Sequence, residues 1–273
     1  MRIAIFSDIH GNSIALDAVL RELKKLGSFD EYWILGDLVA LGPKPIEVLE
    51  RLSDLPNAKF VRGNTDRYVF AGDRPPPSLQ EAAADASKLT ALVECAATFS
   101  WTLGAITQAG WLSWLSELPL EIQVTLPDGT RVLGVHSAPG HDDGFGIKIG
   151  LSENELALVL GDCEADLIIG GHHHRMLDMT VNGRRAINVG SVSNPQPPDL
   201  RASYVVLEAD QAGYQVEFKR VDYDREGVID QVTQQRHPAG NWIIKHFRRQ
   251  HTPFGSDWVQ EQLRYLRTNA NID

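Results

Sequence analysis

The N-terminal stretch RIAIFSDIHGN (residues 2–12) decides the fold, because an apolar run typical of a buried strand ends abruptly in polar residues. Residues 13–26 follow with leucines and a valine at helical spacing, and a glycine ends the pattern. Two further apolar runs, EYWILGD (31–37) and AKFVRGN (58–64), lie on either side of a second helical pattern at 43–55. This strand–helix–strand–helix–strand order predicts a parallel sheet with crossover helices.

Polar side chains follow five of the apolar runs, at the point where each predicted strand ends. These are Asp8-Ile9-His10, Gly36-Asp37, Gly63-Asn64-Thr65-Asp66, His136 after RVLGV, and His172-His173-His174 after ADLIIGG. Each motif alone is typical of a turn or of a partly buried histidine. The carboxyl ends of strands line the binding crevice in open α/β folds, so we expect all five to meet at one edge.

Seven of these side chains are of types that bind metals: two carboxylates, four imidazoles and one amide, with no thiolate. Seven ligands exceed the four of a closed tetrahedral zinc site. They suit two metals that share a bridging carboxylate and keep open positions. Mixed nitrogen and oxygen ligands suit Mn, Fe, Zn, Co or Ni, and the order of affinities does not choose among them.

The ordered motifs resemble those of the calcineurin-like metallophosphoesterases, which read D-x-H, G-D, G-N-H-D/E, a later H and G-H-x-H. The resemblance covers about residues 1–208, and INVGSVSNP (187–195) is similar to a further segment of the family. The short chain and the motif SDIHGN most resemble the YfcE-like phosphodiesterase branch. The resemblance implies an α/β fold, with a mixed two-sheet β-sandwich flanked by helices.

The same resemblance implies how the ligands divide. Asp8, His10 and His174 would bind one divalent metal, and Asn64, His136 and His172 the other, with Asp37 bridging the two; manganese is our first choice. The implied activity is hydrolysis of phosphate mono- or diesters by attack of a metal-bridging hydroxide. The alternative is a dinucleoside polyphosphate hydrolase. A non-catalytic protein-binding scaffold is a weaker alternative, since the scaffold in this family has lost ligands that are all present here.

One position departs from the family pattern. Thr65 stands where the family has a histidine thought to assist the leaving group, and threonine is no general acid near neutral pH. Leaving groups of low pKa would then be favoured, or another group would supply the proton. Our candidates are Asn64, Asp66 and His173 for catalysis, and Thr65, Arg67 and His141 for substrate binding, with His141 a second candidate proton donor.

We expect a single metallophosphoesterase domain over residues 1–273. Residues 67–120 break the alternation and predict a helical cap insertion, with helices at 79–97 and 105–117. Later strands predict antiparallel pairing because their connections are short. Residues 224–273 predict a helical C-terminal extension, whose basic side chains form a solvated surface or a subunit contact, or help anions approach.

Composition limits the partners. A formal charge of −10 argues against a nucleic-acid scaffold with a broad basic surface. We expect a small phosphorylated or nucleotide substrate, no stable nucleic-acid complex and no membrane, since no apolar stretch approaches 18 residues. Cys95 and Cys163, each in an expected helix, suggest reduced thiols and a cytoplasmic location. The sequence leaves the oligomeric state open.

Overall fold

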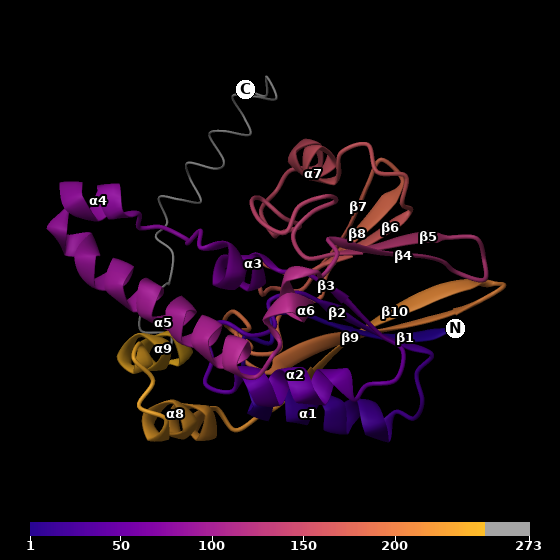
Figure 1. Ribbon diagram of the computed structural model, residues 1–273. Helices are drawn as coiled ribbons and strands as arrows, with labels where there is room; N and C mark the ends of the chain where they lie inside the picture. The colour runs from indigo at the N-terminus through magenta and orange to yellow at the C-terminus, as the bar shows by residue number, and fades with distance from the viewer. Residues whose placement is uncertain (249–273) are drawn as a thin grey trace.

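Two five-stranded mixed sheets face each other in the computed structural model, which describes residues 1–248 (Figure 1). The first sheet has the order β10–β9–β1–β2–β3, with β1 at Arg2–Phe6, β2 at Glu31–Leu35, β3 at Ala58–Val61, β9 at Ala202–Asp210 and β10 at Gly213–Val221. The second has the order β4–β5–β6–β8–β7, with β4 at Glu121–Thr125, β5 at Arg131–Val135, β6 at Leu167–Gly170, β7 at Leu177–Val181 and β8 at Arg184–Asn188. The expected two-sheet sandwich is confirmed.

Strand direction follows the sequence-based expectation for β1–β3 and for the pairs with short connections, whereas the parallel pairing of β5, β6 and β8 was not predicted. β1, β2 and β3 run parallel, joined by the crossover helices α1 (Ser13–Lys25) and α2 (Pro45–Ser53). β5, β6 and β8 are also parallel. The short connections give antiparallel pairs, namely β4 with β5, β7 with β8, and β9 with β10. The carboxyl ends of β1–β3 and of β5–β6 can therefore contribute side chains to one common site.

Three apolar layers hold the sandwich together. Ile3, Trp33 and Leu167 are fully buried between the sheets. Helices cover the outer face of the first sheet, and α7 (Glu153–Leu160) covers the outer face of the second (Figure 1). Complete burial of a side chain as large as Leu contributes about 1.5–3 kcal/mol, so these layers fix how the two sheets sit against each other.

The helical region between β3 and β4 differs in detail from the expectation. It contains α3 (Asn64–Ala71), α4 (Leu79–Ala84), a 3₁₀ turn (Ala86–Lys88), α5 (Leu89–Gln108) and α6 (Leu112–Ser116). The expected break at 98–104 is wrong, because α5 runs through it. Phe99, Thr102 and Ile106 are buried at helical spacing there, and this packing outweighs the poor helix propensity of Gly104.

Helices also follow β10, where α8 (Arg225–Gln234) and α9 (Gly240–Phe247) pack on each other. The Trp101 ring of α5 lies 4.3 Å from the ring of His237, between centroids. The expected C-terminal extension begins with these helices, but its residues 249–273, and much of its basic stretch, lie outside the described residues. That α3–α6 act as a cap over the site stays a prediction.

The segment Ala86–Gln108, which includes α5, is long and apolar enough to cross a membrane by length and composition, with a mean hydropathy of 1.4. The expectation that no apolar stretch approaches this length is wrong here. Only 28% of the apolar window is buried inside the fold, although α5 packs against α2, α3 and α6. Core helices pass the same test, so the finding assigns no location.

The two cysteines differ. Cys95 is buried in α5, as expected, and burial raises the pKa of its thiol to about 11, which makes it unreactive. Cys163 does not lie in a helix. The helix α7 ends at Leu160 because Gly161 takes a positive φ of 55°, a backbone conformation open to glycine.

Candidate metal centre

The predicted ligands come from both sheets. Asp8, Asp37 and Asn64 follow the parallel strands β1, β2 and β3 of the first sheet, whereas His136 follows β5 and the histidine triplet follows β6 of the second. Both sets lie at carboxyl ends of strands, and the packing of the sheets brings these ends together. Contacts between ligands 164 residues apart, such as His10 and His174, show that the two edges meet.

One group of side chains forms the first half of the cluster. His10 Nε2 lies 3.2 Å from His174 Nε2, and His174 Nε2 lies 3.1 Å from Asp8 Oδ1. Asp37 Oδ2 completes the group at 3.6 Å from His10 Nε2. Ligand atoms of these four residues all lie within 4.8 Å of one another, which is close enough for one metal ion to bind them.

A second group lies on the other side of Asp37. Asn64 Oδ1 is 3.1 Å from both His136 Nε2 and His172 Nδ1. Asp37 Oδ1 lies 3.4 Å from His136 Nε2. Asp37 thus directs one carboxylate oxygen to each group, which is the arrangement that a carboxylate bridging two metals needs.

Backbone carbonyls fix the histidine rings. His10 Nδ1 donates to Ala40 O at 3.2 Å, His136 Nδ1 to Leu35 O at 2.7 Å, and His172 Nε2 to Gly144 O at 3.1 Å. With the outer nitrogen protonated, the inner nitrogen of each neutral ring carries a lone pair that faces the cluster. This outer hydrogen bond is the usual support of a metal-binding histidine.

The buried charges in the cluster favour a bound cation. The carboxylates of Asp8 and Asp37 are buried, and within residues 1–248 neither forms an ion pair with a lysine or an arginine. Asp8 Oδ1 is buried without a hydrogen bond. Burial alone would lower the pKa of His136, but Asp37 and Asp8 outweigh it and raise that pKa to about 10. The residues present therefore fit bound divalent metals.

The backbone supports the same conclusion. Five of the seven predicted ligands have a positive φ, namely Asp8 (58°), His10 (48°), Asp37 (56°), His172 (70°) and His174 (57°). Residues other than glycine seldom adopt this conformation, which costs of order 1–3 kcal/mol each and is concentrated at functional sites. Residues 171–174 lie outside any strand, and these φ values turn His172 and His174 into the cluster.

A model of the calcineurin-like phosphoesterase superfamily domain matches residues 1–212, which is well over half of the chain. The chain belongs to this superfamily. An uncharacterised protein of Methanocaldococcus jannaschii is 29% identical over 255 residues, which cover 88% of this chain and 95% of the relative. The crystal structure of a metallophosphoesterase from Sphaerobacter thermophilus matches with a TM-score of 0.69 at 27% identity, covering 91% of this chain and 98% of that one.

A more local likeness connects the chain to a relative with a named activity. The symmetrical bis(5'-nucleosyl)-tetraphosphatase of Vibrio campbellii is 40% identical over 68 residues, which are 24% of this chain and 25% of that enzyme. The match spans only a quarter of either protein. By itself it transfers no substrate. The YfcE-like branch stays a prediction.

Two residues of the calcineurin-like G-N-x-D motif hold Asp37 in place. The backbone N–H of Thr65 donates to Asp37 Oδ1 at 2.9 Å, while its side-chain oxygen is buried without a partner. Asp66 is fully buried and accepts from the N–H groups of Leu38 at 2.9 Å and Gly63 at 3.0 Å. Burial and the charge of Asp37 raise the pKa of Asp66 to about 7. This placement favours a positioning role for Asp66; its catalytic role stays a prediction.

His173, the middle histidine of the triplet, contacts a backbone carbonyl, and its ring lies 4.6 Å from the ring of His172, between centroids. Its Nε2 contacts Phe145 O at 2.7 Å, and its ring approaches Gly146. Burial, together with the neighbouring His172 and Lys148, holds the pKa of His173 well below its usual range. These contacts favour a structural role for His173. Its predicted role as a proton donor stays untested.

We expect His173→Ala to bind as much metal as the wild type while being less stable. The change leaves the Phe145 carbonyl without its donor, at a cost of about 1–3 kcal/mol. The matched change His172→Ala removes a predicted ligand and should lower the metal content. Metal analysis and thermal melting of both variants test this. A His173→Ala protein with full metal and stability but strongly reduced turnover would instead make His173 a proton donor.

The side chain of Arg67 is held by carboxylates rather than turned to the ligands. Arg67 Nε donates to Asp142 Oδ1 at 3.0 Å, a second nitrogen donates to Asp143 at 2.9 Å, and a third pairs with Asp73. Asp142, which is buried, also accepts from Arg62 at 2.7 Å. This network ties α3 to the loop whose Gly144 carbonyl supports His172. The substrate-binding role of Arg67 stays a prediction.

Sequence reasoning missed the role of Asp142. Its only signal was the pair of adjacent acidic residues that follows His141 in a glycine-rich loop. His141 itself is exposed, and its backbone pairs with Ala138. The substrate-binding roles of His141 and Thr65 rest on the sequence alone.

Asp142→Asn should destabilise the fold, because two partly buried guanidinium groups lose their shared carboxylate. We expect a loss of about 1–2 kcal/mol after allowing for solvent screening, and hence a fall in Tm of about 2–8 °C. Asp166→Asn is the matched control, since its pair with Arg131 is exposed on both sides. Equal melting shifts for the two variants would contradict the role of Asp142.

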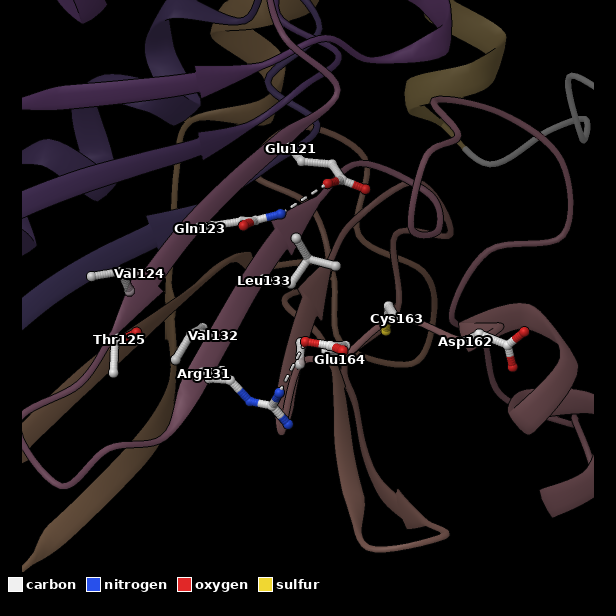
Figure 2. A pocket seen from close by; sticks show the side chains of 11 residues that line it. Glu121, Gln123, Val124, Thr125, Arg131, Val132, Leu133, Asp162, Cys163 and Glu164 are labelled. Carbon is white, nitrogen blue, oxygen red and sulfur yellow. Dashed lines mark hydrogen bonds and ion pairs between the residues drawn. The ribbon is translucent and has the colours of Figure 1, made fainter.

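A cavity in the second sheet lies away from the predicted ligands. It measures about 670 Å³ and lies against β4 and β5, near the turn that follows α7 (Figure 2). Gln123, Arg131, Cys163 and Glu164 are among its lining residues, and none of the predicted ligands is. This cavity is therefore separate from the polar cluster at the strand ends.

Proposed function

We propose that this chain is a phosphoesterase that requires two divalent metals, manganese being our first choice, and that hydrolyses phosphate mono- or diesters. The observation that carries the proposal is the position of Asp37, whose two oxygens each face a separate group of ligands. The family implies a hydrolase that acts on phosphate esters. The substrate we propose is a small phosphorylated molecule or a nucleotide, in a cytoplasmic protein.

The residues have distinct tasks in this proposal. When bound, the metals would acidify a water molecule and stabilise the charge on the phosphoryl oxygens. Asp37 lies between the two ligand groups; the Thr65 N–H donates to its carboxylate, and Asp66 accepts from the N–H of the adjacent Leu38. Asn64 is our candidate to orient the phosphate. Because Thr65 supplies no ionisable side chain, we propose leaving groups of low pKa, such as aryl esters, nucleotides or phosphoanhydrides.

Hydrolysis of dinucleoside polyphosphates is the second candidate. The local 40% identity to a symmetrical bis(5'-nucleosyl)-tetraphosphatase favours it, although the match covers a quarter of the chain. A phosphoanhydride also suits a site without a dedicated proton donor, because its leaving group is already a weak base.

Turnover by metal-loaded protein tests the proposal. The purified chain is stripped with a chelator, reloaded separately with Mn, Fe, Zn, Ni or Co, and assayed with p-nitrophenyl phosphate, bis-p-nitrophenyl phosphate and diadenosine tetraphosphate. We expect hydrolysis of at least one aryl ester, and its loss on chelation. Turnover of diadenosine tetraphosphate alone would select the second candidate. No turnover with any metal and any of these esters would favour the scaffold alternative.

A further inference from the structure

A second cavity adjoins the metal centre. It measures about 250 Å³ and lies between the segment that follows the histidine triplet and the loop at residues 195–199. His174, a predicted ligand, is part of its lining, so the cavity and the centre share a wall. Arg175 and Met176, next along the chain, also line it. A group bound here would lie beside whatever the metals hold.

Hydrogen bonds fix this cavity relative to the metal centre. Gln196 lies in the wall, and its side-chain nitrogen donates to the carbonyl of His173 at 3.2 Å. Its backbone N–H donates to the carbonyl of His174 at 3.3 Å. The loop at 195–199 is thus tied to the triplet itself. The cavity wall and the ligands are positioned together, as a site that orients a substrate requires.

The cavity is positively charged although the protein is acidic. Arg175 is exposed and forms no hydrogen bond or ion pair with any residue in the described range 1–248. Arg220 lines the cavity and lies 3.4 Å from Asp199, a carboxylate that Arg201 already binds with two hydrogen bonds. The cavity lining thus holds two guanidinium groups, those of Arg175 and Arg220, and one carboxylate, Asp199, which Arg201 from outside the lining already pairs. This net positive charge contrasts with −10 for the chain and is suited to an anion.

Apart from the polar residues Gln196 and Ser203, the remaining lining is apolar. The apolar residues of the lining are Met176, Pro195, Pro197 and Pro198. Asp199 is the one acidic residue among the lining residues. Flat apolar rings pack well on such surfaces, and methionine adapts to their shape. The volume is below the usual range for a whole ligand, so the cavity suits one part of a substrate whose reacting phosphate lies on the metals.

We propose that this cavity binds the nucleoside phosphate part of a nucleotide substrate, with its additional phosphate held by Arg175 and Arg220 and its base packed on the proline and methionine wall. The inference rests on the proposed function, because it places the reacting phosphate in the adjacent metal centre. It makes the chain a nucleotide phosphoesterase and adds a specificity site to the seven predicted ligands.

Binding of ADP without metal tests this site separately from catalysis. ADP, pyrophosphate and adenosine are titrated calorimetrically into full-length protein in excess EDTA, for the wild type, Arg175→Ala and Arg220→Ala. We expect ADP to bind more tightly than either fragment. Each substitution should weaken ADP binding about tenfold, as the loss of one charged contact predicts. Arg21→Ala, an exposed arginine on α1, is the matched control and should bind ADP as the wild type does.

Each result bears on one proposal. Undetectable ADP binding by the wild type, or equal binding by all variants of unchanged Tm, would overturn the cavity assignment. ADP binding no tighter than that of pyrophosphate would overturn the role given to the base. If ADP binds as expected but the metal-loaded protein hydrolyses no phosphate ester, the proposed function fails and the nucleotide site stands.

Discussion

Asp37→Ala should abolish both metal binding and turnover. Its carboxylate oxygens lie 3.6 Å from His10 Nε2 and 3.4 Å from His136 Nε2, so the change removes a ligand from both groups at once. We expect turnover of an aryl phosphate to fall by about 10³-fold or more, which corresponds to about 4 kcal/mol of transition-state stabilisation. Elemental analysis of the purified protein should show that the metal content falls with it.

The control for this prediction is Asp54→Ala. Asp54 is exposed at the end of α2, and its side chain has no hydrogen bond or ion pair to residues 1–248, so turnover and metal content should not change. An Asp37→Ala protein that retains its metal and hydrolyses the ester normally would rule out the shared carboxylate and, with it, the dinuclear site.

Gly63→Ala should disrupt the centre without altering any ligand. A Cβ atom at this position would lie 2.2 Å from the Asp37 backbone nitrogen and 2.1 Å from Asp37 Oδ1. Because one of these atoms belongs to the backbone, the clash cannot be relieved by a side-chain rotation alone. We expect a loss of about 3 kcal/mol or more, a fall in Tm of roughly 6–12 °C, and weaker metal binding, because the bridging residue must move.

Gly104→Ala is the matched control for the glycine substitution. Gly104 lies within α5, and no atom lies within 4 Å of the Cβ that would be added. Alanine is the better helix former, so this variant should be stabilised by up to about 1 kcal/mol and keep its metal. If Gly63→Ala melts and binds metal like the wild type, the tight contact between Gly63 and Asp37 has no functional consequence.

The local pattern predicted most of the fold. Each of the five strand ends carries its polar residue directly after an apolar run, and this depends only on neighbouring residues. Helical spacing likewise predicted α1 and α2. The local pattern did not predict the helix α5, because long-range packing decides where that helix begins and ends. Thr98, Gly104 and their neighbours favour a break, but buried Phe99 and Ile106 keep α5 continuous through them.

Side-chain partners were less predictable than the ligands. Arg67, adjacent to the site in sequence, was expected to contact substrate, yet Asp142, 75 residues away, binds its guanidinium group. His173 lies between two ligands in the chain, but its ring contacts the Phe145 carbonyl. Neither partner can be inferred from spacing, because each lies on a loop whose position depends on how the two sheets pack.

The sequence by itself determined which residue types stand at the strand ends, and hence that this chain carries oxygen and nitrogen ligands for metals. Only the tertiary structure decided how they meet. Packing of the two sheets brings His136 from β5 to Asn64 after β3, and a left-handed backbone at Asp8, Asp37, His172 and His174 turns the side chains inward. The physical reason is that ligand chemistry belongs to single residues, whereas distances of 3–4 Å between remote residues depend on the whole core.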